Sequence, residues 1–289
     1  MRRRHTWLAA LAASLALTAA ACSQAPEPTF LGKDRINIGF KSDQPGTGDA
    51  PEYHTTGFDY RVGKRITDKL GVDMAERYVS SADRIPSLTK TKKNDLVIAT
   101  FSITSVRMEA IDFVGPYLKN QQGILVGKSS GIKGLSDLKD KPICTYKGTT
   151  SATLLRQLNI GIPVEKDTAS QCIKAMLNGP EETRPVAMST DQLILYGFAD
   201  QHASEGLHVL PDLTFGPTQM YGIALPKKHR DDCARLLEIV KDYVGSNDWL
   251  EDLRTSLPQA IENNTSWATD YLPSEESILQ NSCTDPSDS

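Results

Sequence analysis

Hydrophobic and polar positions in the first third of the chain follow strand-like and helix-like patterns in turn. Alternation over residues 35–40 and 74–79, and an apolar run over 95–99, predict three strands. Between them, apolar residues at helical spacing predict helices over residues 58–70 and 82–91. Strands and helices therefore alternate as β-α-β-α-β, which is typical of a mostly parallel sheet.

A second unit of the same kind follows residue 122, after Gly-Pro-Tyr at residues 115–117, which we expect to break the pattern. Its strands are predicted at residues 123–127, 142–146, 164–168, 186–188, 207–210 and 221–225. Its helices are predicted around Leu154, Leu155 and Leu158, over residues 170–177, around Leu193 and Ile194, and over residues 233–244. A last, short helix is predicted around Trp249 and Leu253. The chain is polar beyond Asn263. The sequence thus predicts two α/β units.

A candidate carboxylate receptor follows the strand at residues 95–99. Thr104 can act as N-cap of a short helix over residues 105–109, which leaves free backbone N–H groups at its start. Arg107 lies one turn into that helix and can reach the same place. Amides, hydroxyls and a guanidinium together bind a carboxylate. The alternative is a surface arginine on an ordinary helix.

Two further strand exits carry similar chemistry. Residues 148–151, Gly-Thr-Thr-Ser, form a second turn before a helix, which either binds an anion or only caps the helix. Asp191 follows another strand and is either a helix cap or the partner of a ligand ammonium; its position alone favours the cap. Lys41 and Asp43 follow the first strand, where α/β sheets bind ligands, although both could be ordinary loop charges.

The N-terminus has the pattern of an exported lipoprotein. Arg2, Arg3 and Arg4 precede an apolar segment, Leu8 to Leu17, that is too short to span a membrane, and small residues lead to Cys22. Cleavage before Cys22 and lipidation of its thiol are expected, and a plain signal peptide is the alternative. Loss of residues 1–21 leaves 268 of the 289 residues and moves the formal charge from −4 to −7. Such an acidic chain argues against nucleic-acid binding.

Four other cysteines remain in the exported chain. An even number predicts two disulfides among three possible pairings. Proximity within the predicted units favours Cys144 with Cys172 and Cys233 with Cys283. No C-x-x-C pair or His/Cys cluster is present, so no metal site and no cofactor are predicted.

An ordered set of motifs resembles a known family, the bacterial extracellular solute-binding proteins of family 3, which are amino-acid receptors of ABC importers. The motifs are Gly57-Phe58-Asp59, residues 95–99, Ser102-Ile103-Thr104, Arg107, Asp112-Phe113, Pro116-Tyr117, residues 148–151 and Asp191. They cover nearly all of the mature chain in the expected order. Within the family, residues 41–46, 115–118, 143–144, 170–172 and 190–197 resemble the actinobacterial glutamate-binding lipoproteins, a group in which a Cys144–Cys172 disulfide is expected.

The resemblance implies a two-lobed α/β fold of the type II periplasmic-binding-protein kind, with two mixed sheets flanked by helices and joined by two hinge strands. Its expected parts are a signal peptide over residues 1–21, a tether over 22–34, lobe 1 over 35–121 plus 221–289, and lobe 2 over 122–220. The protein is expected to be a monomer that is not an enzyme, anchored by lipid at the extracellular face of the membrane.

The resemblance also implies roles for single residues. Arg107 would pair with the ligand α-carboxylate, helped by Thr104, Thr149, Thr150 and Ser151. Asp191 would accept the α-ammonium, helped by Thr100 and Ser102. Lys41 is the candidate second cation for an acidic side chain, and Phe101 replaces a common small residue near the pocket.

The implied function is delivery of glutamate, or a related polar amino acid, to an ABC-importer permease. Two alternatives stay open at this point. One is a sensor of the same fold that serves a signalling partner. The other is an enzyme resembling the cyclohexadienyl dehydratases, which would need a placed general acid or base.

Overall fold

The computed structural model of the protein describes residues 29–284. The predicted signal peptide (residues 1–21), the predicted lipidation site Cys22 and residues 23–28 of the predicted tether lie outside the described residues. The strands are β1 (Arg35–Phe40), β2 (Asp43–Gln44), β3 (Gly48–Asp49), β4 (Asp73–Tyr78), β5 (Leu96–Val97), β6 (Ile111–Gly127), β7 (Pro142–Tyr146), β8 (Ile162–Lys166), β9 (Ala187–Asp191), β10 (Leu207–Val209) and β11 (Phe215–Pro226). The α-helices are α1 (Phe58–Leu70), α2 (Arg84–Thr89), α3 (Ser105–Met108), α4 (Thr150–Gln157), α5 (Ala169–Asn178), α6 (Gln192–Gln201), α7 (Arg230–Val244), α8 (Asn247–Ser256), α9 (Pro258–Glu262), α10 (Trp267–Asp270) and α11 (Glu275–Asn281).

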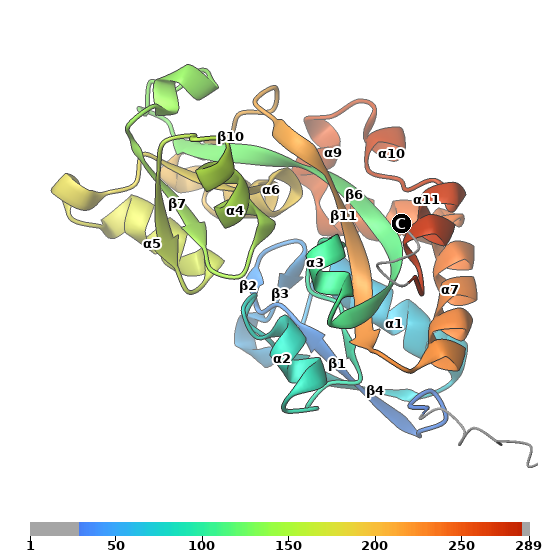
Figure 1. The fold of residues 1–289 in the computed structure, drawn as a ribbon. Helices are drawn as coiled ribbons and strands as arrows, with labels where there is room; N and C mark the ends of the chain where they lie inside the picture. The colour runs from blue at the N-terminus through green and yellow to red at the C-terminus, as the bar shows by residue number, and fades with distance from the viewer. Residues whose placement is uncertain (1–28, 285–289) are drawn as a thin grey trace, which may run out of the picture.

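Strands β6 and β11 run antiparallel to each other between two groups of elements (Figure 1). One group, here called lobe 1, contains β1–β5 with α1–α3 and α7–α11. The other, lobe 2, contains β7–β10 with α4–α6. Hydrogen bonds link the main strands in the order β4-β1-β5-β11-β6-β9-β7-β8, and β10 pairs with β6. The pairs β1–β4, β1–β5, β7–β8 and β7–β9 are parallel, as the alternating pattern predicts.

Two sequence predictions about the connecting strands and the tail were wrong. The Gly-Pro-Tyr at residues 115–117 does not break the pattern, because β6 runs through it from Ile111 to Gly127. The helix around Trp249 and Leu253 is not the last one, since α9, α10 and α11 follow it. Their apolar residues are too sparse to show a helical period, yet Ile278 of α11 is buried in the core.

The helices form where the apolar pattern places them. Helix α1 buries Phe58, Val62 and Ile66 on one face, and its end is fixed by Gly71, whose φ of 70° is the left-handed conformation that glycine favours. Helix α6 is apolar around most of its circumference and is buried from Gln192 to Ala199. A helix of this kind needs neighbours on all sides, and α6 contacts both β6 and α9 of lobe 1.

Part of the segment expected to be a tether packs on lobe 1. Phe30 and Leu31 are buried in the core. The Asp232 carboxylate at the start of α7 accepts hydrogen bonds from the backbone N–H groups of Phe30 (2.9 Å) and Leu31 (3.4 Å). The folded part of the chain therefore begins before residue 35.

Each lobe contains one disulfide, and both pairings are those that the sequence predicted. Cys144 of β7 bonds to Cys172 of α5, and Cys233 of α7 bonds to Cys283 after α11. The first holds a helix of lobe 2 to its sheet. The second fixes the C-terminal tail on lobe 1.

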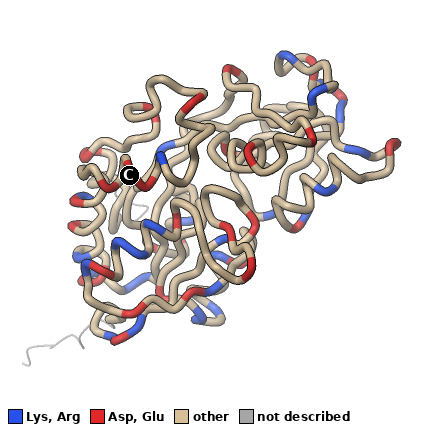
Figure 2. Tube along the Cα trace, turned by 180° about the vertical axis from the view of Figure 1, so that it is seen from behind, with Lys and Arg blue, Asp and Glu red and all other residues tan. Residues whose placement is uncertain are grey.

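Acidic and basic residues are intermixed along the trace and do not separate by sign into two faces (Figure 2).

Between residues 29 and 284, none of the helices has the length and apolar character needed to cross a bilayer.

Candidate ligand-binding site between the lobes

The lobe 1 side of the site is built where β5 gives way to α3. The side chain of Thr104 caps α3 by accepting a hydrogen bond from the Arg107 backbone N–H at 3.3 Å. The Arg107 guanidinium turns back and donates to the Ser102 carbonyl at 2.6 Å. The predicted cap and the predicted position of the arginine are therefore present together, with the cation held beside the strand exit.

Thr100 is held at this exit by a buried carboxylate. Its φ of 45° is uncommon for a residue with a side chain. Its backbone N–H donates to Asp59 Oδ2 at 2.7 Å, and the Tyr117 hydroxyl donates to Asp59 Oδ1 at 2.6 Å. Burial raises the pKa of Asp59 to about 7. Asp59, from the Gly-Phe-Asp motif, thus fixes the backbone of Thr100 through this hydrogen bond.

The lobe 2 side repeats the same construction. The Thr149 hydroxyl caps α4 by accepting from the Ala152 N–H at 3.2 Å, and it donates to the Tyr146 carbonyl at 2.7 Å. Gly148, in the turn before it, has a φ of 76°. The start of α4, with Thr150 and Ser151, therefore faces the lobe 1 corner, and the Thr150 and Ser102 hydroxyls approach to 3.4 Å.

Asp191 is the acidic group of the site. It ends β9 and precedes α6. Its side chain makes no capping hydrogen bond, so Asp191 does not act as a helix cap. The Tyr221 hydroxyl donates to its Oδ2 at 2.6 Å. Its Oδ1 is buried and has no hydrogen-bond partner within the described residues. Burial raises the pKa of Asp191 to about 6.

A second buried guanidinium, Arg84, belongs to the site. It donates to the carbonyls of Ser81, Ala99, Thr100 and, across the lobes, Gly148, at 2.9–3.1 Å. Burial lowers the pKa of Arg84 to about 10, and burial with repulsion from Arg84 lowers that of Arg107 to about 9, so both stay charged at neutral pH. Both guanidiniums lie over the Phe101 ring, 4.2 Å and 4.7 Å from its centre, which explains an aromatic residue there.

These groups surround a small cavity between the lobes, with a volume of about 10 Å³. Its lining residues are Ser81, Arg84, Thr100, Ser102, Arg107, Tyr146, Thr149, Thr150, Ser151, Thr190, Asp191 and Ile194. A cavity of this size holds about one water, so a larger polar ligand would require the two walls to move apart.

Seven of the nine predicted ligand-binding residues line this cavity. They are Thr100, Ser102, Arg107, Thr149, Thr150, Ser151 and Asp191. Thr104 is not among the lining residues, because its hydroxyl caps α3. Lys41 is not brought to the cavity either: its side chain is 1% exposed, and its Nζ lies 3.1 Å from Asp43 Oδ1. Arg84, and not Lys41, is the cation that lines the cavity together with Arg107.

Sequence reasoning missed Ser81, Arg84, Tyr146, Thr190 and Ile194. Ser81 and Arg84 follow β4, and Tyr146 ends β7, so the rule that strand exits face the ligand would have found them. The apolar spacing of Ile85 and Leu88 instead placed Arg84 within a predicted helix, with no indication of a role at the site. Only the fold shows that this first turn points into the cavity.

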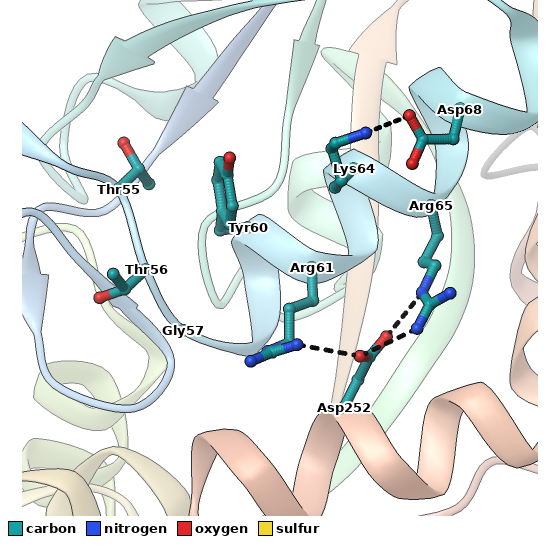
Figure 3. Close-up of a pocket in the computed structure, with 9 residues that line it drawn as sticks. All are labelled: Thr55, Thr56, Gly57, Tyr60, Arg61, Lys64, Arg65, Asp68 and Asp252. Atoms are coloured by element: carbon teal, nitrogen blue, oxygen red, sulfur yellow. Dashed lines mark hydrogen bonds and ion pairs between the residues drawn. The ribbon is translucent and has the colours of Figure 1, made fainter.

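An open hollow on lobe 1, of about 390 Å³, is a weaker candidate (Figure 3). It lies along α1 beside Asp252 of α8. Arg61 and Arg65 both bind the Asp252 carboxylate, and Lys64 pairs with Asp68. Since its arginines already have a carboxylate partner, we interpret this hollow as part of the contact between α1 and α8. Within residues 29–284, no group of His, Cys, Asp and Glu side chains is arranged to hold a metal ion.

Comparison with known proteins adds independent information. The family model "Bacterial extracellular solute-binding proteins, family 3" matches residues 36–266. The glutamate-binding protein GluB of Corynebacterium efficiens is 31% identical over 234 residues, covering 76% of this chain and 78% of GluB. The ABC transporter glutamine-binding protein GlnH of Bacillus subtilis is 32% identical over 201 residues, covering 67% of this chain and 70% of GlnH.

Solved structures show the same fold. The solute receptor for L-cysteine of Neisseria gonorrhoeae superimposes with a TM-score of 0.73 at 22% identity, covering 84% of this chain and 98% of the receptor. At this identity the likeness concerns architecture alone. The predicted type II two-lobed fold is confirmed.

Proposed function

The chain belongs to the bacterial extracellular solute-binding proteins, family 3, and from that premise we propose that it captures an acidic α-amino acid, glutamate first, between its lobes and delivers it to an ABC-transporter permease. Lipidation at Cys22 would hold it at the extracellular face of the cell membrane. The glutamate- and glutamine-binding relatives support the amino-acid class.

One observation carries the choice of an acidic ligand: the charges of the cavity. Arg84 and Arg107 are cations and Asp191 is an anion when ionised, so the cavity has a net charge of +1. Glutamate carries two carboxylates and one ammonium, and its net charge of −1 complements this set. A neutral amino acid would leave one buried guanidinium without an anion, which is unfavourable at low dielectric.

The geometry supports one orientation of the ligand. The α-carboxylate would bind Arg107 and the start of α4 at Thr150 and Ser151, where helix N–H groups favour an anion. The α-ammonium would donate to the unpartnered Oδ1 of Asp191. The side-chain carboxylate would then face Arg84, beside the buried Ser81 hydroxyl, which also has no partner within the described residues.

Each of these charge-assisted hydrogen bonds contributes about 1.5–3 kcal/mol. Closure of the lobes would exclude water and strengthen them. The closed shape would then report occupancy to the permease.

Isothermal titration calorimetry with glutamate, aspartate, glutamine and asparagine tests the proposal. We expect glutamate or aspartate to bind at least about a hundredfold more tightly than either amide, because an amide leaves the buried Arg84 guanidinium without an anionic partner, a loss of about 3 kcal/mol. Absence of binding to all four would refute the amino-acid assignment. Tighter binding of glutamine than of glutamate would refute the acidic preference alone.

A further inference from the structure

A short segment of lobe 1 meets lobe 2 beside the cavity. Asp43 follows β1, and its Oδ2 accepts hydrogen bonds from the backbone N–H groups of Ala169 (2.9 Å) and Ser170 (3.4 Å) at the start of α5. The Ser170 hydroxyl donates back to the Asp43 carbonyl at 3.3 Å. A carboxylate from one lobe thus caps a ten-residue helix of the other, where the helix dipole favours negative charge.

Lys41 holds this carboxylate in place. Its Nζ lies 3.1 Å from Asp43 Oδ1, the oxygen that α5 does not use. The lysine side chain is 1% exposed, so its charge depends on this partner. The ion pair and the cap together use both oxygens of Asp43.

Gln44 connects the same segment to the cavity walls. Its Oε1 accepts from the Thr100 hydroxyl of lobe 1 at 2.9 Å, and its Nε2 donates to the Tyr146 hydroxyl of lobe 2 at 2.8 Å. Thr100 and Tyr146 both line the cavity, whereas Gln44 does not. Its fully buried amide therefore fixes one wall against the other without touching the space for the ligand.

A glycine permits the close approach of the lobes next to this point. A Cβ atom added to Gly197 of α6 would lie 1.8 Å from the carbonyl oxygen of Pro45. Because that oxygen belongs to the backbone of the other lobe, an alanine at position 197 would force the lobes apart. The observed arrangement of the lobes requires glycine here.

From these contacts we infer that Asp43, Gln44 and Pro45 form a closure latch that positions the cavity walls and sets the affinity for ligand without touching it. The latch acts through Thr100, Tyr146 and the start of α5. The identity of the ligand rests on the proposed function, whereas the latch rests on the inter-lobe contacts alone. Apparent affinity falls with the fraction of molecules able to adopt the binding-competent form.

Gly197→Ala tests the latch against a matched control. Gly127→Ala changes another glycine where the added Cβ has no heavy atom within 4 Å, and its φ is ordinary. Alanine is a better helix former than glycine, so Gly197→Ala does not weaken α6 itself. With glutamate we expect at least tenfold weaker binding in Gly197→Ala and less than twofold change in Gly127→Ala. Wild-type affinity in Gly197→Ala would overturn the inference.

Asp43→Asn provides a second variant in case the packing of α6 does not tolerate alanine. It removes the charge that caps α5, so ligand should dissociate at least threefold faster in stopped-flow measurements. These are made at a temperature where circular dichroism shows the variant to be folded, because the buried Lys41 ammonium loses its carboxylate partner and the thermal midpoint should fall. Unchanged dissociation would contradict the role of Asp43.

A ligand-free experiment separates failure of the latch from failure of the proposed function. Cysteines replacing Asp200 of α6 and Gln259 of α9, whose side chains meet across the lobes at 3.2 Å outside the latch, should form a disulfide under mild oxidation when the lobes close transiently. Adding Gly197→Ala to this pair should slow disulfide formation at least tenfold, and adding Gly127→Ala should not. Equal rates would overturn the latch even if glutamate binds, and a tenfold difference would support it even if no amino acid binds.

Discussion

The unpartnered oxygen of Asp191 links ligand affinity to pH. The ammonium binds the ionised carboxylate, and burial raises the pKa of Asp191 to about 6 in the free protein. Below that pH a proton competes with the ligand, so glutamate affinity should be about tenfold lower at pH 5 than at pH 8. Calorimetry across this range measures the change, and a flat profile would contradict the assigned role.

Unfolding cannot explain that loss. The pKa values of Asp191 and Asp59 are raised to about 6 and about 7, above the ordinary value near 4, so the folded state binds more protons than the unfolded state between about pH 4 and pH 7. These two groups therefore stabilise the fold as the pH falls through that range. Asp191→Asn is the control: it should bind weakly at every pH and lose the acidic dependence, while its thermal midpoint shows that it is folded.

Sequence reasoning found some of the cavity residues because their signal is local. Arg107 lies three residues after its cap, so spacing placed it near a ligand corner. For Asp191 the position alone favoured a helix cap, and the family resemblance supplied the ligand role. The missed cation, Arg84, lies in the first turn of α2, where the sequence pattern indicates only a helix packed against the sheet. Lys41 has the right charge at a strand exit, but its buried ammonium pairs with Asp43, two residues away. Which cation reaches the cavity depends on side-chain direction, which spacing does not encode.

At the scale of elements, helix α5 is held to β7 by the Cys144–Cys172 disulfide, which closes a separation of 28 residues. A cross-link of this length stabilises by about 3–4 kcal/mol, mainly by restricting the unfolded chain. Replacing both cysteines by serine should lower the free energy of unfolding in urea by roughly that amount. Glutamate affinity should change by less than about threefold, because neither cysteine lines the cavity.

The matched control is the double serine variant at Cys233 and Cys283, which opens a separation of 50 residues in lobe 1. It should lose at least as much unfolding free energy, since the closed loop is longer. An unchanged free energy of unfolding in the Cys144–Cys172 variant would show that the disulfide does not hold lobe 2 together.

The elements themselves were largely predictable, and the failures have physical causes. Strong periodicity over residues 58–70 predicted α1 with its bounds. Strand β6 passes through Gly115–Pro116 because it pairs with β11 and β9, and a local pattern cannot indicate that tertiary pairing. The tail helices α9, α10 and α11 are short, so their apolar residues complete no full period. They are held by tertiary packing and by the Cys233–Cys283 disulfide.

At the scale of the whole molecule, the two strand-exit corners become one site only through the long strands β6 and β11. The sequence shows the corners separately, 40 or more residues apart, and the family resemblance supplied their pairing. The latch of residues 43–45 on α5 and α6 had no sequence signal, because it joins segments more than 120 residues apart. Local patterns therefore predict the walls of the cavity, whereas the contacts that bring the walls together come from the fold.

A crystal structure of the protein grown with glutamate tests the central claim most directly. We expect closed lobes with the α-carboxylate on Arg107, the ammonium on Asp191 Oδ1 and the side-chain carboxylate on Arg84, each within 3.2 Å, the usual upper limit for such bonds. A glutamate whose side-chain carboxylate faces away from Arg84, or an empty cavity at saturating glutamate, would contradict the account.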